Sequence, residues 1–214
     1  MKDLRMELRT RESLAVMTVF ALAVILLFSF AFDIGMNRFP SFVPGLMWLT
    51  YFFTAVLGLI RSFGWEKELD AWDILLTSPV DRSMIYLGKC AAFFIFLLLA
   101  QLISLPFFML FLGLPLLAAP LSFIAILLTV DGAIAAVGVL IAGMSHRTPA
   151  GETLLPILLF PTLTPVLIAA TKATTTALAS KPFQEWDFWL MLIVTFLVLF
   201  VLAGAFIFDY IAEQ

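Results

Sequence analysis

Six long stretches of apolar residues, separated by short polar segments, dominate the chain. They lie at about residues 13–32, 42–60, 90–112, 121–143, 153–171 and 188–208. Each is close to the roughly 20 mainly apolar residues that an α-helix needs to cross the hydrocarbon core of a bilayer. The pattern predicts an all-α, polytopic membrane protein with six transmembrane helices. The connections are too short for a second domain, so residues 1–214 form one transmembrane domain.

The distribution of Lys and Arg near the span ends predicts the orientation. If the N-terminus is inside, nine of these residues are cytoplasmic: Lys2, Arg5, Arg9, Arg11, Arg61, Lys67, Arg82, Lys89 and Arg147. Three lie outside: Arg38, Lys172 and Lys181. Cytoplasmic connections carry the excess of basic residues, so both termini are expected in the cytoplasm. The basic N-terminus precedes an apolar run longer than a signal-peptide core, without an A-x-A-like cleavage site, which indicates a retained first span.

The segment between the second and third spans, residues 62–88, is unusually charged. Over residues 62–78 its pattern is helical, with an apolar stripe formed by Trp65, Leu69, Trp72 and Leu76. A neighbouring face is acidic and carries Glu66, Asp70 and Asp73. Pro79 marks the expected end of this amphipathic helix. Interfacial anchors usually carry Lys and Arg, so the acidic face favours a basic protein partner over a helix that merely floats at the headgroups.

The fifth span contains three prolines, Pro156, Pro161 and Pro165. Each proline removes a backbone donor and obstructs the preceding helical turn. We therefore expect a kinked or broken span that packs against protein, because freed carbonyl groups are unfavourable in lipid.

The composition supports a membrane protein and excludes several functions. Of the 214 residues, 63% are hydrophobic and 13% are charged, and the mean hydropathy is +1.11. The sequence has no zinc-type Cys/His spacing, no long basic run and no G-x-x-x-x-G-K-[ST] motif. Metal binding, nucleic-acid binding and ATP binding by this chain are therefore not expected. No G-x-S-x-G motif or other catalytic arrangement supports an enzyme, and no covalent cofactor is expected.

Asp131 is the main polar candidate inside a span. A charged carboxylate at this depth is costly and usually has a partner or lines a wet cavity, which favours a role in translocation. Alternatively, Asp131 is protonated or hydrogen-bonded and ties helices together, with Gln101 of the antiparallel third span as the partner. Both interpretations remain open at this point.

Two other groups of residues have simpler interpretations. His146 is the only histidine, and a solvated loop position is favoured over an axial metal ligand because no second histidine is present. Trp186 and Trp189, with Asp187, could contact a ligand or a partner, but an aromatic belt at the membrane interface is favoured.

Three motifs together resemble a known family. The charged segment ELDAWDILLTSPV followed by YLGK is similar to the segment between the second and third spans of ABC-2-type permeases. VPGLMWLT at 43–50 and LLPILLFPTLTPVLI at 154–168 extend the resemblance, in order and spacing, to the CcmB family. This family forms the membrane permease of the cytochrome c maturation ABC transporter, and the resemblance covers nearly the whole chain.

The resemblance implies an ABC-2-type permease fold in which the charged segment is a cytoplasmic coupling helix. The residues expected to contact the ATPase are Glu66, Glu68, Leu69, Asp70, Trp72, Asp73, Leu76 and Pro79. The chain departs from the family pattern in having Asp70 where a Gly is frequent and Asp73 where a Glu is frequent. If that Gly provides a kink for docking, the coupling geometry differs here.

The resemblance also implies partners and a location. These are a separate ABC ATPase (CcmA-like) that binds ATP, haem-handling membrane proteins (CcmC-like and CcmD-like), haem as the handled ligand, and a second copy of the chain. The expected location is the bacterial inner membrane. The alternatives are an ABC-2-type permease for a lipid or a drug, and a six-span scaffold or enzyme that is not a transporter.

Overall fold

The computed structural model describes residues 12–32, 42–68, 81–145 and 151–211, without the side chains of residues 65–68, 152 and 208–211. The α-helices are α2 (Glu12–Phe32), α3 (Val43–Glu68), α5 (Arg82–Leu112), α6 (Pro120–Ser145), α7 (Gly151–Leu178) and α8 (Asp187–Ile211). Two short 3₁₀ turns, η1 (Leu116–Ala118) and η2 (Phe183–Glu185), precede α6 and α8. These residues contain no β-strand.

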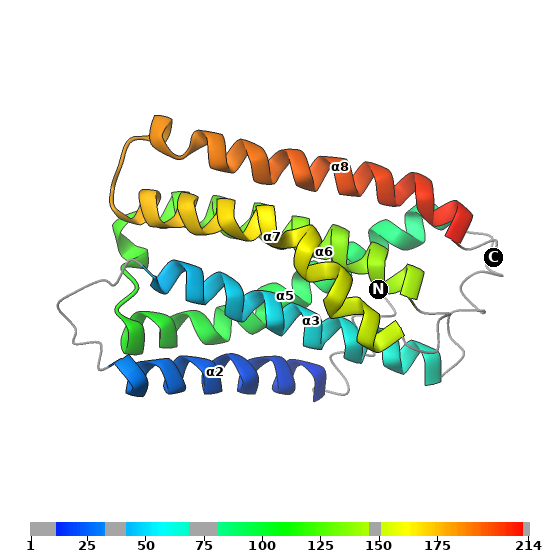
Figure 1. Cartoon of the computed structure of the whole chain (residues 1–214), viewed down its shortest axis with the longest axis horizontal. Helices are drawn as coiled ribbons and strands as arrows, with labels where there is room; N and C mark the ends of the chain where they lie inside the picture. Colours follow the sequence, from blue (N-terminus) through cyan, green and yellow to red (C-terminus); the bar gives the residue numbers. More distant parts are fainter. Residues whose placement is uncertain (1–11, 33–41, 69–80, 146–150, 212–214) are drawn as a thin grey trace.

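All six α-helices are long and apolar enough to cross a membrane, which confirms the prediction of an all-α, six-span membrane protein. They run back and forth along one bundle, with α2 and α8 at opposite edges (Figure 1). In the spans of α3 and α6, 72% and 67% of the residues are buried, against 17% and 11% in α2 and α8. The bundle therefore has an interior built mainly on α3 and α6, whereas α2 and α8 leave most of their surface for lipid or another protein.

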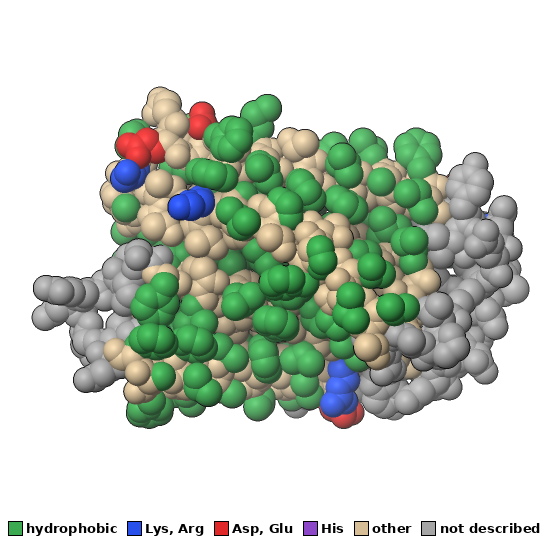
Figure 2. All heavy atoms as spheres, in the orientation of Figure 1, with side chains coloured by type: hydrophobic (Ala, Val, Ile, Leu, Met, Phe, Trp, Pro, Cys, Tyr) green, Lys and Arg blue, Asp and Glu red, His purple; other side chains and the backbone are tan. Residues whose placement is uncertain are grey.

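The two ends of the bundle serve as reference points below. At the α5–α6 end, α3 begins, α5 and α7 end, and α6 and α8 begin; at the α3–α5 end, α3 ends and α5 begins (Figure 1). On the face drawn in Figure 2, hydrophobic side chains cover the middle and the charged side chains lie near the helix ends. This distribution suits a bundle surrounded by hydrocarbon.

Two helices extend beyond the predicted spans into the charged segment. The second span was expected to end at about residue 60, but α3 continues without a break to Glu68. The third was expected to begin at residue 90, but α5 begins at Arg82. Both ends of the 62–88 segment are thus continuous with transmembrane helices, and residues 69–80 lie outside the described part of the chain.

The proline-containing span, α7, is bent rather than broken. It is one helix from Gly151 to Leu178, with Pro156, Pro161 and Pro165 inside it, and its axis changes direction along its length (Figure 1). Two threonine hydroxyls in the same region donate to carbonyls four residues earlier: Thr162 to Leu158 at 2.8 Å and Thr164 to Phe160 at 2.6 Å. Threonine bonds of this kind often bend helices, so they add to the effect of the prolines.

Tyr86 joins three helices near the α3–α5 end. Its hydroxyl lies 2.9 Å from the carbonyl oxygen of Ala136 in α6 and 3.1 Å from that of Phe200 in α8. Helix α8 can approach only because residue 204 is glycine, since a Cβ there would overlap the Tyr86 ring and hydroxyl. The side chain and the glycine are therefore one packing unit.

We predict that Gly204→Ala destabilises the bundle by about 1–3 kcal/mol, the usual range for overpacking, because Tyr86 must leave its position between α6 and α8. Thermal unfolding of the detergent-solubilised protein measures the effect. Gly88→Ala is the matched control, since a Cβ there meets nothing within 4 Å. Equal stability of the two variants would contradict the predicted packing.

Candidate functional site: a buried polar cluster

The amide of Gln101 in α5 donates a hydrogen bond from Nε2 to Oδ1 of Asp131 in α6, at 2.8 Å. Both side chains are fully buried. Gln101 lies eleven residues before the end of α5 at Leu112, and Asp131 lies eleven residues after the start of α6 at Pro120. At a rise of about 1.5 Å per residue, each is about 16 Å from the α5–α6 end, near the middle of a bilayer core of about 30 Å. This is the hydrogen bond that one of the two interpretations of Asp131 required, and a role of Asp131 in translocation stays a prediction.

Two hydroxyl groups extend this pair into a cluster. The Ser104 and Tyr51 hydroxyl oxygens are 3.4 Å apart, and the Ser104 hydroxyl also lies 3.2 Å from the carbonyl oxygen of Gln101. Ser104 and Tyr51 are fully buried as well. Each lies eight residues from the α5–α6 end of its helix, or about 12 Å. We call Tyr51, Gln101, Ser104 and Asp131 the polar cluster; it joins α3, α5 and α6.

A further hydrogen bond lies closer to the α5–α6 end. The indole Nε1 of Trp48 in α3 donates to the Thr174 hydroxyl of α7 at 2.9 Å, and both residues are buried. Trp48 contacts Tyr51 edge-on, with ring centroids 6.1 Å apart, and Tyr51 contacts Phe108 in the same way at 5.6 Å. Polar groups from four helices thus extend from near this end of the bundle to its middle.

The polar cluster contains two polar atoms without partners. Oδ2 of Asp131 and Oε1 of Gln101 are buried and form no hydrogen bond with any described residue. Two ion pairs among the described residues, Arg61 with Glu12 and Lys181 with Glu185, are both exposed and do not involve Asp131. A buried carboxyl group with one free oxygen is unusual, because an unsatisfied buried polar group costs free energy.

The chemistry that the polar cluster offers is hydrogen bonding and proton binding. It contains one carboxyl, one amide and two hydroxyl groups. Among the residues that the structure describes, no group of three or more His, Cys, Asp and Glu side chains could hold a metal ion. The sequence identified Asp131 and Gln101 as candidates but missed Tyr51 and Ser104. Tyr51 and Ser104 lie at the same distance from the ends of their helices, which was the signal that could have paired them.

Two of the predicted ATPase-coupling residues lie at the other end of the bundle. These are Glu66 and Glu68, which belong to the last turns of α3. The other six, Leu69, Asp70, Trp72, Asp73, Leu76 and Pro79, are outside the described residues, as is His146.

A buried lysine marks the place where the charged segment joins the bundle. Lys89 is only 6% exposed, and its Nζ lies 5.3 Å from the centroid of the Phe63 ring in α3, a cation–π distance. The sequence placed Lys89 among the cytoplasmic charges and in the YLGK motif, but it did not predict that this side chain is buried. The contact ties the first part of α5 to the last part of α3.

Trp186, which lies between η2 and α8, packs against the protein. Trp186 is buried and contacts the Phe183 ring edge-on at 4.7 Å, and Trp189 contacts Phe188 at 5.2 Å. The Asp187 carboxylate accepts a hydrogen bond from the backbone N–H of Phe188 at 2.6 Å. Trp186 is therefore a packing residue that is not available to a ligand in this arrangement.

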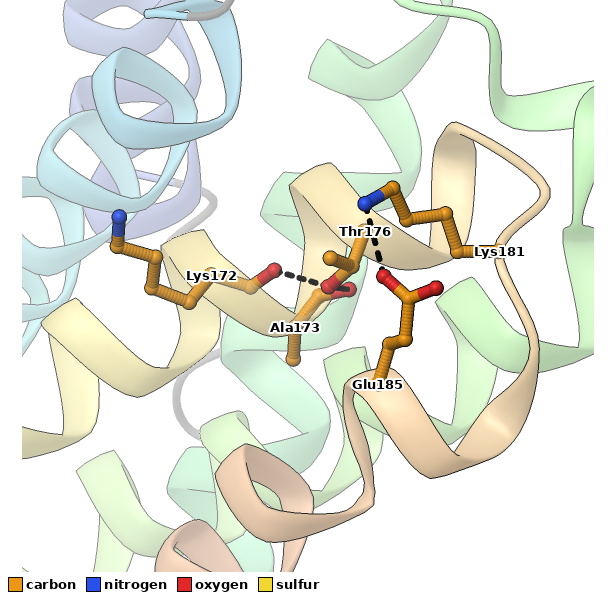
Figure 3. Close-up of polar contacts among 5 residues, drawn as sticks. All are labelled: Lys172, Ala173, Thr176, Lys181 and Glu185. Atoms are coloured by element: carbon orange, nitrogen blue, oxygen red, sulfur yellow. Dashed lines mark hydrogen bonds and ion pairs between the residues drawn. The ribbon is translucent and has the colours of Figure 1, made fainter.

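The exposed charges of the same region are shown in Figure 3. Lys181 and Glu185 face each other across the turn between α7 and α8, with Nζ and Oε2 2.8 Å apart, whereas the Lys172 side chain points away from them. An exposed pair of this type contributes little to stability. These residues form a polar border to the α5–α6 end.

The comparison with known proteins decides the family. A family model described as CcmB protein matches residues 1–210. The chain belongs to the CcmB family. It is 29% identical over 192 residues to heme exporter protein B of Pseudomonas aeruginosa, covering 88% of this chain and 84% of that protein. It is 28% identical over 172 residues to heme exporter protein B of Paracoccus denitrificans, covering 80% and 78%.

CcmB membership confirms the resemblance carried by the three sequence motifs. The family match spans every element of the polar cluster as well as the charged segment. The polar cluster therefore lies within the part of the chain that the family model matches.

We predict that Thr174→Val destabilises the bundle by about 1–3 kcal/mol, because it leaves the buried Trp48 N–H without an acceptor. Thermal unfolding measures the loss. Thr162→Val is the matched control, since its hydroxyl bonds only to the carbonyl of Leu158 in its own helix. Combining Thr174→Val with Trp48→Phe should cost less than the sum of the single changes, and strict additivity would argue against the bond.

Proposed function

We propose that the chain is the membrane permease subunit of an ABC transporter for cytochrome c maturation. In this role it couples ATP hydrolysis by a separate subunit to haem export or to the release of a haem chaperone. The observation that carries the proposal is the CcmB family match over residues 1–210, together with relatives named heme exporter protein B. That match favours haem over a lipid or drug cargo and favours a transporter subunit over an enzyme.

The continuity of α3 and α5 with the charged segment supports a coupling role. A displacement of residues 69–80 by a partner would act directly on two transmembrane helices, because α3 ends at Glu68 and α5 begins at Arg82. The Lys89–Phe63 contact holds these two helices together near that point. The same helices carry Tyr51, Gln101 and Ser104, so motion at the α3–α5 end can reach the polar cluster through rigid elements.

The proposed partners rest on the absence of a phosphate-binding loop from the sequence and on the acidic face of the charged segment. Without a phosphate-binding loop, ATP binds to a separate CcmA-like ATPase, which contacts the acidic face of the charged segment. CcmC-like and CcmD-like membrane proteins handle haem in the same complex, and a second copy of the chain completes the permease. Lipid surrounds the bundle.

The location we propose is the bacterial inner membrane, with both termini cytoplasmic. The excess of Lys and Arg supports this orientation. So does the position of the start of α2 and the end of α8, which lie toward the same end of the bundle as the end of α3 and the start of α5 (Figure 1).

We predict that reversing three acidic residues, Glu66→Lys, Glu68→Lys and Asp73→Lys, releases the ATPase from the complex. The expected result is at least a tenfold loss of co-purified ATPase, corresponding to about 1.4 kcal/mol of binding free energy. The measurement is quantitative mass spectrometry of the tagged protein purified gently from its native membrane.

Two charge reversals serve as controls for that experiment. One control is Glu185→Lys, because Glu185 lies at the opposite end of the bundle. The other is Glu12→Lys, because Glu12 lies in α2, where its carboxylate pairs with Arg61. Both should retain the ATPase. Retention by the triple variant as well would remove the charged segment from the coupling role.

A further inference from the structure

We propose that Asp131 holds a proton and forms a neutral, doubly hydrogen-bonded pair with Gln101, which makes the centre of the bundle a proton-binding site. In this pair the Gln101 amide donates from Nε2 to Oδ1 of Asp131, as observed. The proton on Oδ2 of Asp131 is donated in return to Oε1 of Gln101. The proposal is independent of the function proposed above.

The two partnerless atoms carry the inference. Oδ2 of Asp131 and Oε1 of Gln101 belong to the same two side chains that already share one hydrogen bond. An ionised carboxylate can only accept hydrogen bonds, and so can the amide oxygen. Adding one proton to Oδ2 turns one of the two acceptors into a donor and lets a single bond satisfy both atoms.

The surroundings of Asp131 favour the neutral form. An ionised carboxylate in an apolar interior requires a paired charge. The groups that face Asp131 from α5 and α3 are Gln101 and the Tyr51 hydroxyl, both uncharged, and Tyr51 is fully buried. Helices α7 and α8 also pack against α6, but no Asp, Glu, Lys or Arg among their described residues is hydrogen-bonded or ion-paired to Asp131.

Protonation and helix packing are linked at this position. The pair holds α5 to α6 by two hydrogen bonds when Asp131 is neutral. Loss of the proton would remove the bond between Oδ2 and Oε1, and it would leave a charge in the bundle interior. The contact between these helices should therefore weaken when the proton leaves.

The side chains allow a sharp test, because asparagine has nearly the shape of protonated aspartic acid. In Asp131→Asn, the new amide can donate to Oε1 of Gln101 while its oxygen accepts from Nε2. We expect this variant to fold and to be at least as thermally stable as the wild type at neutral pH, because only the wild type must take up a proton on folding. If Asp131 is instead ionised and held by a bound cation or water, the substitution adds a donor where an acceptor is needed, and a clear drop in Tm would overturn the proposal.

Infrared spectroscopy of the purified full-length chain in lipid bilayers detects the proton directly. At neutral pH the wild type should show a carbonyl band of a protonated carboxyl group that shifts when aspartate is labelled with ¹³C. The band should be absent in Asp131→Asn. A wild-type spectrum without this band would overturn the proposal.

Exchanging the carboxyl and amide groups between α5 and α6 distinguishes loss of the reciprocal pair from a general destabilising effect of mutation. Gln101→Glu alone places two carboxyl groups face to face and should lower the Tm. Adding Asp131→Asn restores one acid and one amide with both side-chain lengths kept, so the Tm should recover. The infrared band should return and now shift with ¹³C-labelled glutamate; failure of the double variant to recover would contradict the reciprocal pair.

The pH dependence of thermal stability tests the link between protonation of Asp131 and helix packing. From mildly acidic to alkaline pH the wild type should lose thermal stability relative to Asp131→Asn, because over this range the unfolded wild type releases a proton that the folded chain retains. Groups elsewhere in the chain titrate in both proteins, so their contribution cancels in the difference. A difference in Tm that is constant across this pH range would overturn the proposal.

Discussion

The absence of water in a bilayer core is the constraint on which the structure depends. A polar group that the bundle buries costs free energy unless it finds a partner within the protein. Backbone groups do so inside six long helices. Buried side chains do so across helices, as in Trp48 with Thr174, Gln101 with Asp131, and Tyr86 with the carbonyls of Ala136 and Phe200. These contacts connect α3 to α7, and α5 to α6 and α8, at defined depths.

Contacts between α3, α5 and α6 also connect the two ends of the bundle. At the α3–α5 end, α3 and α5 emerge into the charged segment and are held together by Phe63 and Lys89. Near the middle, the same two helices meet α6 at the polar cluster. Under the proposed function, a partner that moves the charged segment would shift buried hydrogen bonds. The donors and acceptors of these bonds have few alternative partners in the bundle interior. Small displacements would then have large energetic consequences.

The sequence was sufficient for the features that depend on hydrophobicity and depth. Six apolar stretches predicted six spans, and counting from the span ends placed Gln101 opposite Asp131. The sequence was insufficient where the rotation of a helix about its axis decides which side chains face the bundle interior. Tyr51 and Ser104 face the cluster, and Trp186 faces the bundle rather than the lipid interface, because of packing that no local pattern records. The prolines of α7 likewise predicted a disturbed helix but did not distinguish a bend from a break.

The most direct test of coupling through α3 and α5 is a distance measurement in the complex purified from its native membrane. Spin labels at Leu49 in α3 and Leu102 in α5, which are 40% and 68% exposed, report on the relative position of these helices in the half of the bundle away from the charged segment. Coupling predicts that their distance distribution changes when ATP is added to the complex. Identical distributions with and without ATP, in a complex that hydrolyses ATP, would contradict it.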